Sequence, residues 1–144
     1  MAHRPFTGCI PDDRLYCPEH DMWVQSLANG EVLIGASSFG IFLAGEIIAF
    51  TSKPCGAEVA MHRGMGTVEC RKTVLALHAP ISFVLLEGNE AAEEQPQRVN
   101  AEPYGAGWMA RGRPTQWAAE QGNLLDAAAY RAHIRRIEPE ARFV

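Results

Sequence analysis

Short runs of apolar residues, separated by turn-forming residues, recur along most of the chain. Alternation and β-branched content predict strands at 22–25, 31–36, 46–52, 67–70, 73–77, 81–87 and 108–111. Asn29 and Gly30 lie between the first two runs, and such a pair supplies the positive φ that a tight hairpin needs. Many short strands with turn signals between them indicate an all-β sandwich or a flattened barrel.

A helical period appears in only three places. Ser37 or Ser38 can cap a short helix that runs through Leu43, with Gly45 beyond its end. Residues 90–95 offer one or two helical turns before Pro96 stops them. In residues 124–137, apolar side chains recur every three or four positions, which predicts an amphipathic helix. We expect a mainly β fold with short flanking helices and a C-terminal helix, after an irregular, polar lead-in.

Length and charge narrow the class of protein. With 144 residues the chain suits one domain, large enough to bury a core without disulfides or metals. A net charge of -4 and the lack of a basic patch argue against nucleic acid as a partner. No apolar run reaches the roughly 20 residues of a membrane span, and no secretory signal stands at the N-terminus. We therefore expect a cytoplasmic protein without membrane partners.

Four cysteines, Cys9, Cys17, Cys55 and Cys70, are too far apart for any C-x-x-C pair. Cys17 and His20 form the nearest metal-type pair, but no second pair follows at short spacing. The sequence therefore predicts no metal site, and free thiols that are mostly partly buried. Phosphate-binding loops and nucleophile motifs are also lacking, so nothing predicts a catalytic residue.

The chain has only two lysines, Lys53 and Lys72. Lys72 and its neighbour Arg71 join the strands predicted at 67–70 and 73–77, so a hairpin would hold Lys72 at its tip. A solvated lysine is the ordinary interpretation of such a residue. Basic charge in this chain is otherwise carried by arginine, so a lysine on a turn is less readily explained as a residue that only aids solubility. An exposed lysine there also suits covalent modification.

Three motifs follow one another in order along the chain. They are Val68-Glu69-Cys70-Arg71-Lys72-Thr73, then Ala79-Pro80, and then Asn89-Glu90-Ala91, Pro96, Val99-Asn100 and Pro103-Tyr104-Gly105-Ala106-Gly107-Trp108. Upstream, His20 and Trp23 are similar to a His-x-Trp-Val opening. This order resembles the lipoyl-carrying H-protein of the glycine cleavage system and its relatives. The resemblance covers about residues 15–137, which implies one domain there, a lead-in at 1–14 and a tail at 138–144.

The resemblance implies a β-barrel-sandwich hybrid fold and lipoate as a covalent lipoamide on Lys72. Such a protein is a carrier that serves partner enzymes and is not an enzyme itself. Glu69 would lie on the strand beside the lysine, where a lipoate ligase or a lipoyl synthase system could read it. It is equally consistent with an ordinary solvated carboxylate. Two departures stand out: Cys70 replaces a serine, and Met61-His62 replaces a Lys-Gly pair.

The opening at residues 8–16 resembles a different branch, the lipoate-binding proteins of heterodisulfide-reductase-like complexes in bacterial sulfur oxidation. On the basis of that resemblance, we expect the lipoamide arm, meaning the Lys72 side chain with its attached lipoyl group, to shuttle a sulfur intermediate between such a complex and a sulfurtransferase. The alternative is an H-protein that carries the aminomethyl group among the glycine cleavage enzymes. A scaffold or lipoyl-transfer intermediate without turnover is a third interpretation. Biotin is disfavoured, because Arg71 and Thr73, not methionines, flank Lys72.

Strand alternation also predicts the environment of Cys70. On a regular strand Cys70 shares the side of Val68 and points away from Glu69 and Arg71. Because Val68 is apolar, we expect Cys70 to be buried and chemically inert. A bulge in the hairpin would turn the thiol outward and make it a second redox group beside the arm.

Overall fold

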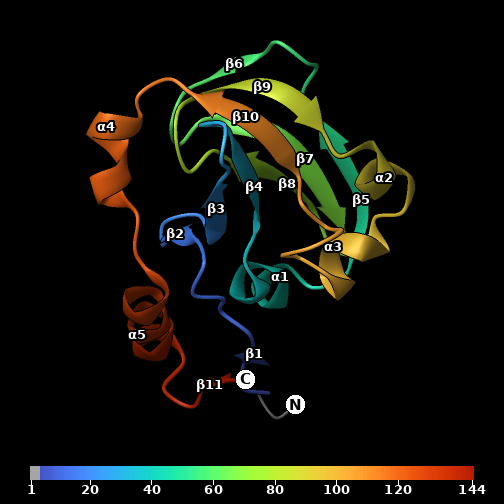
Figure 1. Cartoon of the computed structure of the whole chain (residues 1–144). Coiled ribbons are helices and arrows are strands. Elements are labelled where there is room, and N and C mark those ends of the chain that lie inside the picture. Colours follow the sequence, from blue (N-terminus) through green and yellow to red (C-terminus); the bar gives the residue numbers. More distant parts are fainter. Residues whose placement is uncertain (1–3) are drawn as a thin grey trace.

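The computed structural model describes residues 4–144, and two β-sheets form its body (Figure 1). The larger sheet has the strand order β2-β3-β4-β10-β9-β6, and the smaller one has the order β5-β7-β8. The strands are β2 (Leu15–Cys17), β3 (Met22–Ser26), β4 (Val32–Ala36), β5 (Ile47–Ser52), β6 (Glu58–Val59), β7 (Gly64–Cys70), β8 (Val74–His78), β9 (Phe83–Gly88) and β10 (Ala110–Pro114). The mainly β architecture predicted from the sequence is confirmed.

The first hairpin and the helix after it follow their sequence signals. Strands β3 and β4 pair antiparallel, and Gly30 takes φ 85 in the turn between them. Helix α1 (Ser38–Ala44) starts after Ser37, whose side chain accepts a hydrogen bond from the backbone N–H of Gly40. It ends at Gly45, whose φ of 86 only glycine adopts without strain.

Two strands begin two residues later than the sequence predicts. Ser82 donates its backbone N–H to the Glu120 carboxylate at 2.7 Å, so the ladder of β9 starts at Phe83. Trp108 donates its backbone N–H to the carbonyl oxygen of Gly105 at 3.1 Å, so it belongs to a turn that precedes β10. In both cases an acceptor outside the sheet takes the backbone N–H that strand pairing would otherwise use.

Helix α2 (Glu90–Glu94) lies where the sequence predicts helical turns, whereas three short helices are not predicted. These are α3 (Gln97–Ala101), α4 (Trp117–Glu120) and the 3-10 helix η1 (Gln121–Asn123). Helix α5 (Ala127–Ile137) is shorter than predicted, because Asp126 caps it by accepting the backbone N–H of Ala129.

The two ends of the chain pair with each other. Strand β1 (Thr7–Gly8) runs parallel to β11 (Arg142–Phe143), next to α5 and α1 (Figure 1). The sequence predicts an irregular lead-in at this place, and the structure has a strand because its partner comes from the other end of the chain. The domain boundaries at 14/15 and 137/138 stay predictions.

The buried apolar side chains form two clusters. The larger one fills the space between the sheets, and the smaller one joins Phe6, Tyr16, Trp23, Phe39, Tyr130 and Ile134 beneath α5. Within residues 4–144, none of the helices has the length and apolar character that crossing a membrane requires.

Candidate lipoyl-lysine hairpin and its surroundings

Strands β7 and β8 form a hairpin in which Glu69 pairs with Val74 and Val68 with Leu75. The backbone N–H of Cys70 donates to the carbonyl oxygen of Thr73 at 2.8 Å, which leaves Arg71 and Lys72 as the two turn residues. Neither Arg71 nor Lys72 has a positive φ, since Asp21 and His62 are the only non-glycine residues with a positive φ in the described part of the chain. The turn therefore needs no glycine, and two long side chains are accommodated at its tip.

The two turn residues differ in their contacts. Arg71 donates to the Glu46 carboxylate at 2.7 Å, although 75% of the arginine and 57% of the glutamate side chain remain exposed. Such a solvated ion pair contributes little to stability, but it orients Arg71 toward the start of β5. Lys72 is exposed, and among the described residues it has no hydrogen-bond or ion-pair partner. Its predicted position at the hairpin tip is confirmed, while its modification stays a proposal.

The residues of β7 before the turn alternate between solvent and core. Glu69 is exposed, whereas Val68 and Cys70 are 4% and 5% exposed. The β7–β8 register shifts only between Gly64 and Gly66, so no bulge turns Cys70 outward. The prediction of a buried Cys70 is confirmed.

The other cysteines divide into two kinds. All four are free thiols; Cys9 and Cys55 are exposed, while Cys17 is buried like Cys70. The expectation that the thiols are mostly partly buried is therefore wrong for Cys9 and Cys55.

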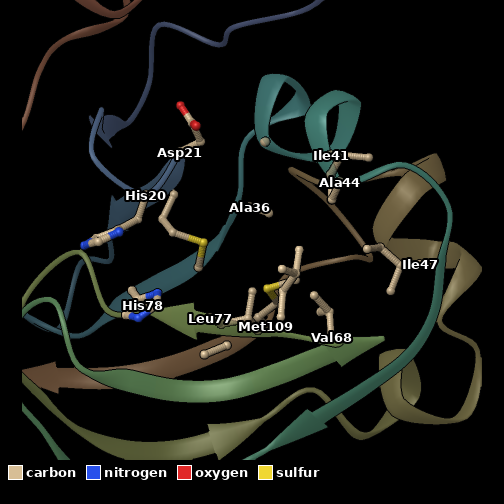
Figure 2. Close-up of a pocket in the computed structure, with 14 residues that line it drawn as sticks. His20, Asp21, Ala36, Ile41, Ala44, Ile47, Val68, Leu77, His78 and Met109 are labelled. Atoms are coloured by element: carbon tan, nitrogen blue, oxygen red, sulfur yellow. The ribbon is translucent and has the colours of Figure 1, made fainter. Parts of the chain in front are cut away.

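An apolar cavity of about 170 Å³ lies between α1 and the inner face of the lysine hairpin (Figure 2). Val68, Leu77 and Met109 line it on the sheet side, and Ile41 and Ala44 line it on the helix side. No local pattern in the sequence predicts this cavity, because it depends on the packing of α1 against strands that are distant in sequence.

Two histidines stand at one end of this cavity, His20 from the β2–β3 turn and His78 from the end of β8 (Figure 2). Their rings stack with centroids 4.9 Å apart. A third imidazole joins them, since His20 Nε2 lies 2.8 Å from His62 Nδ1. Burial lowers the pKa of His20 below its ordinary value, and the neighbouring His78 and His62 lower it further.

Cys17 lies next to these histidines. Its thiol donates to the Glu19 carboxylate at 3.3 Å, and burial together with this hydrogen bond raises the pKa of Cys17 to about 12. Cys17 and His20 are near each other in sequence, but the sequence contains no signal that His62 joins them.

The sequence and the structure of the chain were compared with those of known proteins. The sequence profile of the family described as "Glycine cleavage H-protein" matches residues 14–137. The chain belongs to the glycine cleavage H-protein family.

Individual relatives agree with this assignment. A glycine cleavage system H protein of Mycolicibacterium vanbaalenii is 34% identical over 127 residues, which are 87% of this chain and 96% of the relative. One from Chlorobium luteolum is 39% identical over 126 residues, covering 87% and 97% of the two chains. The crystal structure of the Mycobacterium marinum H protein superposes with a TM-score of 0.75 at 32% identity, covering 85% of this chain and 97% of that one.

Members of the glycine cleavage H-protein family carry lipoate covalently on a lysine and serve partner enzymes as carriers. The carrier class and the lipoate cofactor expected from the sequence are thereby confirmed. The relatives named above are glycine cleavage system H proteins, which agrees with the alternative that the sequence offers, an H-protein of glycine cleavage. The setting favoured from the sequence, sulfur oxidation, gains no support from them.

Proposed function

We propose that lipoate is attached to Lys72 and that this H-protein presents it to the enzymes of glycine cleavage. The observation that carries the proposal is the isolation of Lys72 on an exposed two-residue turn, within the Val68–Thr73 motif. A side chain without polar partners can enter a ligase and later reach several enzymes in turn. Lys53 is exposed as well, but it follows β5 directly, stands before Pro54 and lacks the motif.

The protein contributes position and recognition. Once attached, lipoamide supplies a disulfide that can be opened to a dithiol and closed again. The paired strands β7 and β8 hold the base of the arm, and tethering raises its local concentration at a docked partner. Val74 and Leu75 are 61% and 41% exposed directly after the turn, an apolar surface that suits contact with partner enzymes.

Lipoylation tests the first half of the proposal. The wild-type chain is co-expressed with a lipoate ligase and analysed by intact mass and peptide mapping, beside Lys72→Arg and Lys53→Arg. We expect a single lipoyl group on the wild type and on Lys53→Arg, and none on Lys72→Arg. Arginine preserves the charge, so the fold should persist in both variants. Modification at Lys53, or any modification of Lys72→Arg, would contradict the assignment.

Reconstitution tests the second half. The lipoylated protein is combined with a glycine decarboxylase, an aminomethyltransferase and a dihydrolipoyl dehydrogenase. Tetrahydrofolate is supplied to accept the one-carbon group and NAD⁺ to reoxidise the dithiol, and NADH formation is followed. Glycine-dependent turnover that disappears in Lys72→Arg supports the proposal. A lipoylated protein that sustains no turnover with any partner set would instead indicate a scaffold or a lipoyl-transfer intermediate.

One observation favours a second candidate, the carriage of sulfur between a sulfurtransferase and a heterodisulfide-reductase-like complex. The opening at residues 8–16, which resembles the proteins of that pathway, lies largely outside the family match at 14–137. It is firmly attached to the body: Tyr16 donates its hydroxyl to the carbonyl oxygen of Pro11 at 2.6 Å, and Arg131 donates to that of Ile10 at 2.6 Å. It thus provides a defined surface that an additional partner could recognise.

The same protein preparation separates the two candidates. The lipoylated chain is divided into two samples. The reduced dithiol form is incubated with a sulfurtransferase and a sulfane-sulfur donor, the oxidised disulfide form is incubated with glycine and glycine decarboxylase, and the two masses are compared. Sulfur uptake without glycine-dependent loading would establish the second candidate, and the reverse result the first. The cytoplasmic location expected from the sequence stays a prediction.

A further inference from the structure

Three metal-ligating side chains converge beside the cavity. The Sγ atom of Cys17 and one imidazole nitrogen each of His20 and His62 all lie within 4.8 Å of one another. We propose that Cys17, His20 and His62 form a binding site for a transition-metal ion of the zinc class. The inference is independent of lipoate, since Lys72 takes no part in it.

The donor set suits this kind of ion. One thiolate and two imidazoles leave a fourth position open, a ligand number known from zinc sites. With bonds of about 2.0–2.1 Å to nitrogen and 2.3 Å to sulfur, tetrahedral ligand atoms are about 3.4–3.6 Å apart. In the structure the two histidine nitrogens are 2.8 Å apart, and no two of the three ligand atoms are more than 4.8 Å apart. Small side-chain rotations, chiefly of the exposed His62, are therefore sufficient.

The backbone of His62 supports a role for its side chain. His62 has a φ of 71, a conformation that is strained for a residue with a Cβ and that glycine adopts freely. Backbone hydrogen bonds hold it there, since the N–H of His62 donates to the carbonyl oxygen of Ala79 and the N–H of Ala79 donates to that of Arg63, at 2.8 and 2.7 Å. This strained turn directs an imidazole at His20, where a glycine would leave the position empty.

Surrounding residues hold the ligands in place. The ring of His78 stacks on that of His20 and limits its rotation. The Glu19 carboxylate accepts a hydrogen bond from the Cys17 thiol. It is close enough to stay beside the sulfur when a metal ion binds. Binding releases the thiol proton to solvent and leaves a thiolate that the cation stabilises.

The site would join two parts of the fold that are remote in sequence. Cys17 ends β2 and His20 lies in the turn before β3, both in the larger sheet. His62 lies just before β7, which belongs to the smaller sheet. A bound ion would therefore link the two sheets at the histidine end of the cavity and stabilise the native state by mass action.

Cobalt is the probe for the test, because cysteinate coordination gives it a charge-transfer band and tetrahedral geometry gives it intense d–d bands. The full chain carrying Lys72→Arg, and hence free of lipoate, is reduced, stripped of metal and titrated with Co²⁺. We expect one ion per chain, a cysteinate band, and displacement by Zn²⁺. We also expect a higher Tm with Zn²⁺ than without it.

Two variants and two matched controls locate the ligands. His62→Gly removes an imidazole while relieving the positive φ, so the variant should fold at least as well as the parent without metal. It should lose affinity by at least about tenfold, together with the Zn²⁺-dependent rise in Tm. Cys17→Ser should lose the charge-transfer band. Cys9→Ser and Cys55→Ser remove exposed thiols and should leave binding unchanged.

Three results would overturn the proposal. The first is a titration without a cysteinate band, which would mean that His20 and His62 only hydrogen-bond to each other and the Cys17 thiol only to Glu19. The second is unchanged affinity in His62→Gly. The third is loss of binding in Cys9→Ser or Cys55→Ser, which would move the metal to a surface thiol.

Discussion

The hydroxyl of Tyr130 in α5 donates a hydrogen bond to the carboxylate of Asp21 at 2.7 Å, across 109 residues of sequence. Because that proton is committed to Asp21, the Ser37 hydroxyl, 2.7 Å away, must donate to the tyrosine oxygen. Ser37 in turn accepts the backbone N–H of Gly40 at the start of α1. One chain of hydrogen bonds therefore connects α5, α1 and the β2–β3 turn.

Removing the tyrosine hydroxyl should destabilise the fold. Burial raises the pKa of Tyr130, so the hydroxyl stays protonated and remains a donor throughout the physiological range. Tyr130→Phe leaves Asp21 and Ser37 short of a partner, and we expect a loss of about 1–3 kcal/mol in the free energy of unfolding. Urea denaturation measures it. In the double variant with Asp21→Asn, the two losses should be less than additive, and full additivity would show that the pair is not coupled.

The N-terminal segment should be part of the folding unit even though the family match begins at residue 14. Phe6 is fully enclosed and meets the rings of Phe39 and Phe42 edge to face, with centroids 5.3 and 5.4 Å apart. Phe6→Ala should cost about 3–5 kcal/mol in urea denaturation. The exposed Leu43 provides the control, since Leu43→Ala should change the stability little. Equal effects of the two substitutions would show that the segment is dispensable.

Cysteine labelling should follow burial. With iodoacetamide under native conditions, we expect Cys9 and Cys55 to react quickly and Cys70 to react only as slowly as the protein opens. Peptide mass spectrometry over time gives the separate rates. Cys70→Ser should lose no more carrier turnover than the decrease in its folded fraction explains. Rapid alkylation of Cys70 together with a large loss of turnover would instead make it a redox partner of the arm.

Glu69 should influence modification and not folding. Its side chain is exposed beside the lysine turn, so Glu69→Ala should leave Tm nearly unchanged. If the ligase reads the carboxylate, the rate of lipoylation at Lys72 should fall by about tenfold, the typical worth of one charged contact. Glu58→Ala, which removes an exposed strand glutamate from the other sheet, is the matched control. Equal rates for both variants would make Glu69 an ordinary solvated carboxylate.

Local signals in the sequence predict most of the lysine hairpin, formed by β7, the Arg71–Lys72 turn and β8. β-branched residues on both sides of Arg71 and Lys72 specify two strands, and alternation alone places Val68 and Cys70 inside and Glu69 outside. The cap of α1 was readable for the same reason, because Ser37 and Gly45 act within a single turn of chain. Strand ends were less certain wherever a distant side chain competes for the backbone, as Glu120 does at Ser82.

The metal-type cluster and the pairing of the chain ends were decided only by the tertiary structure. Cys17 and His20 stand three residues apart and predict no site alone, and the completing ligand comes from the loop before β7. Likewise β1 has no local signal, because its partner β11 lies at the far end of the chain. Periodicity and capping express interactions within a few residues. Contacts between segments remote in sequence depend on how the sheets and helices pack, which no short stretch of sequence encodes.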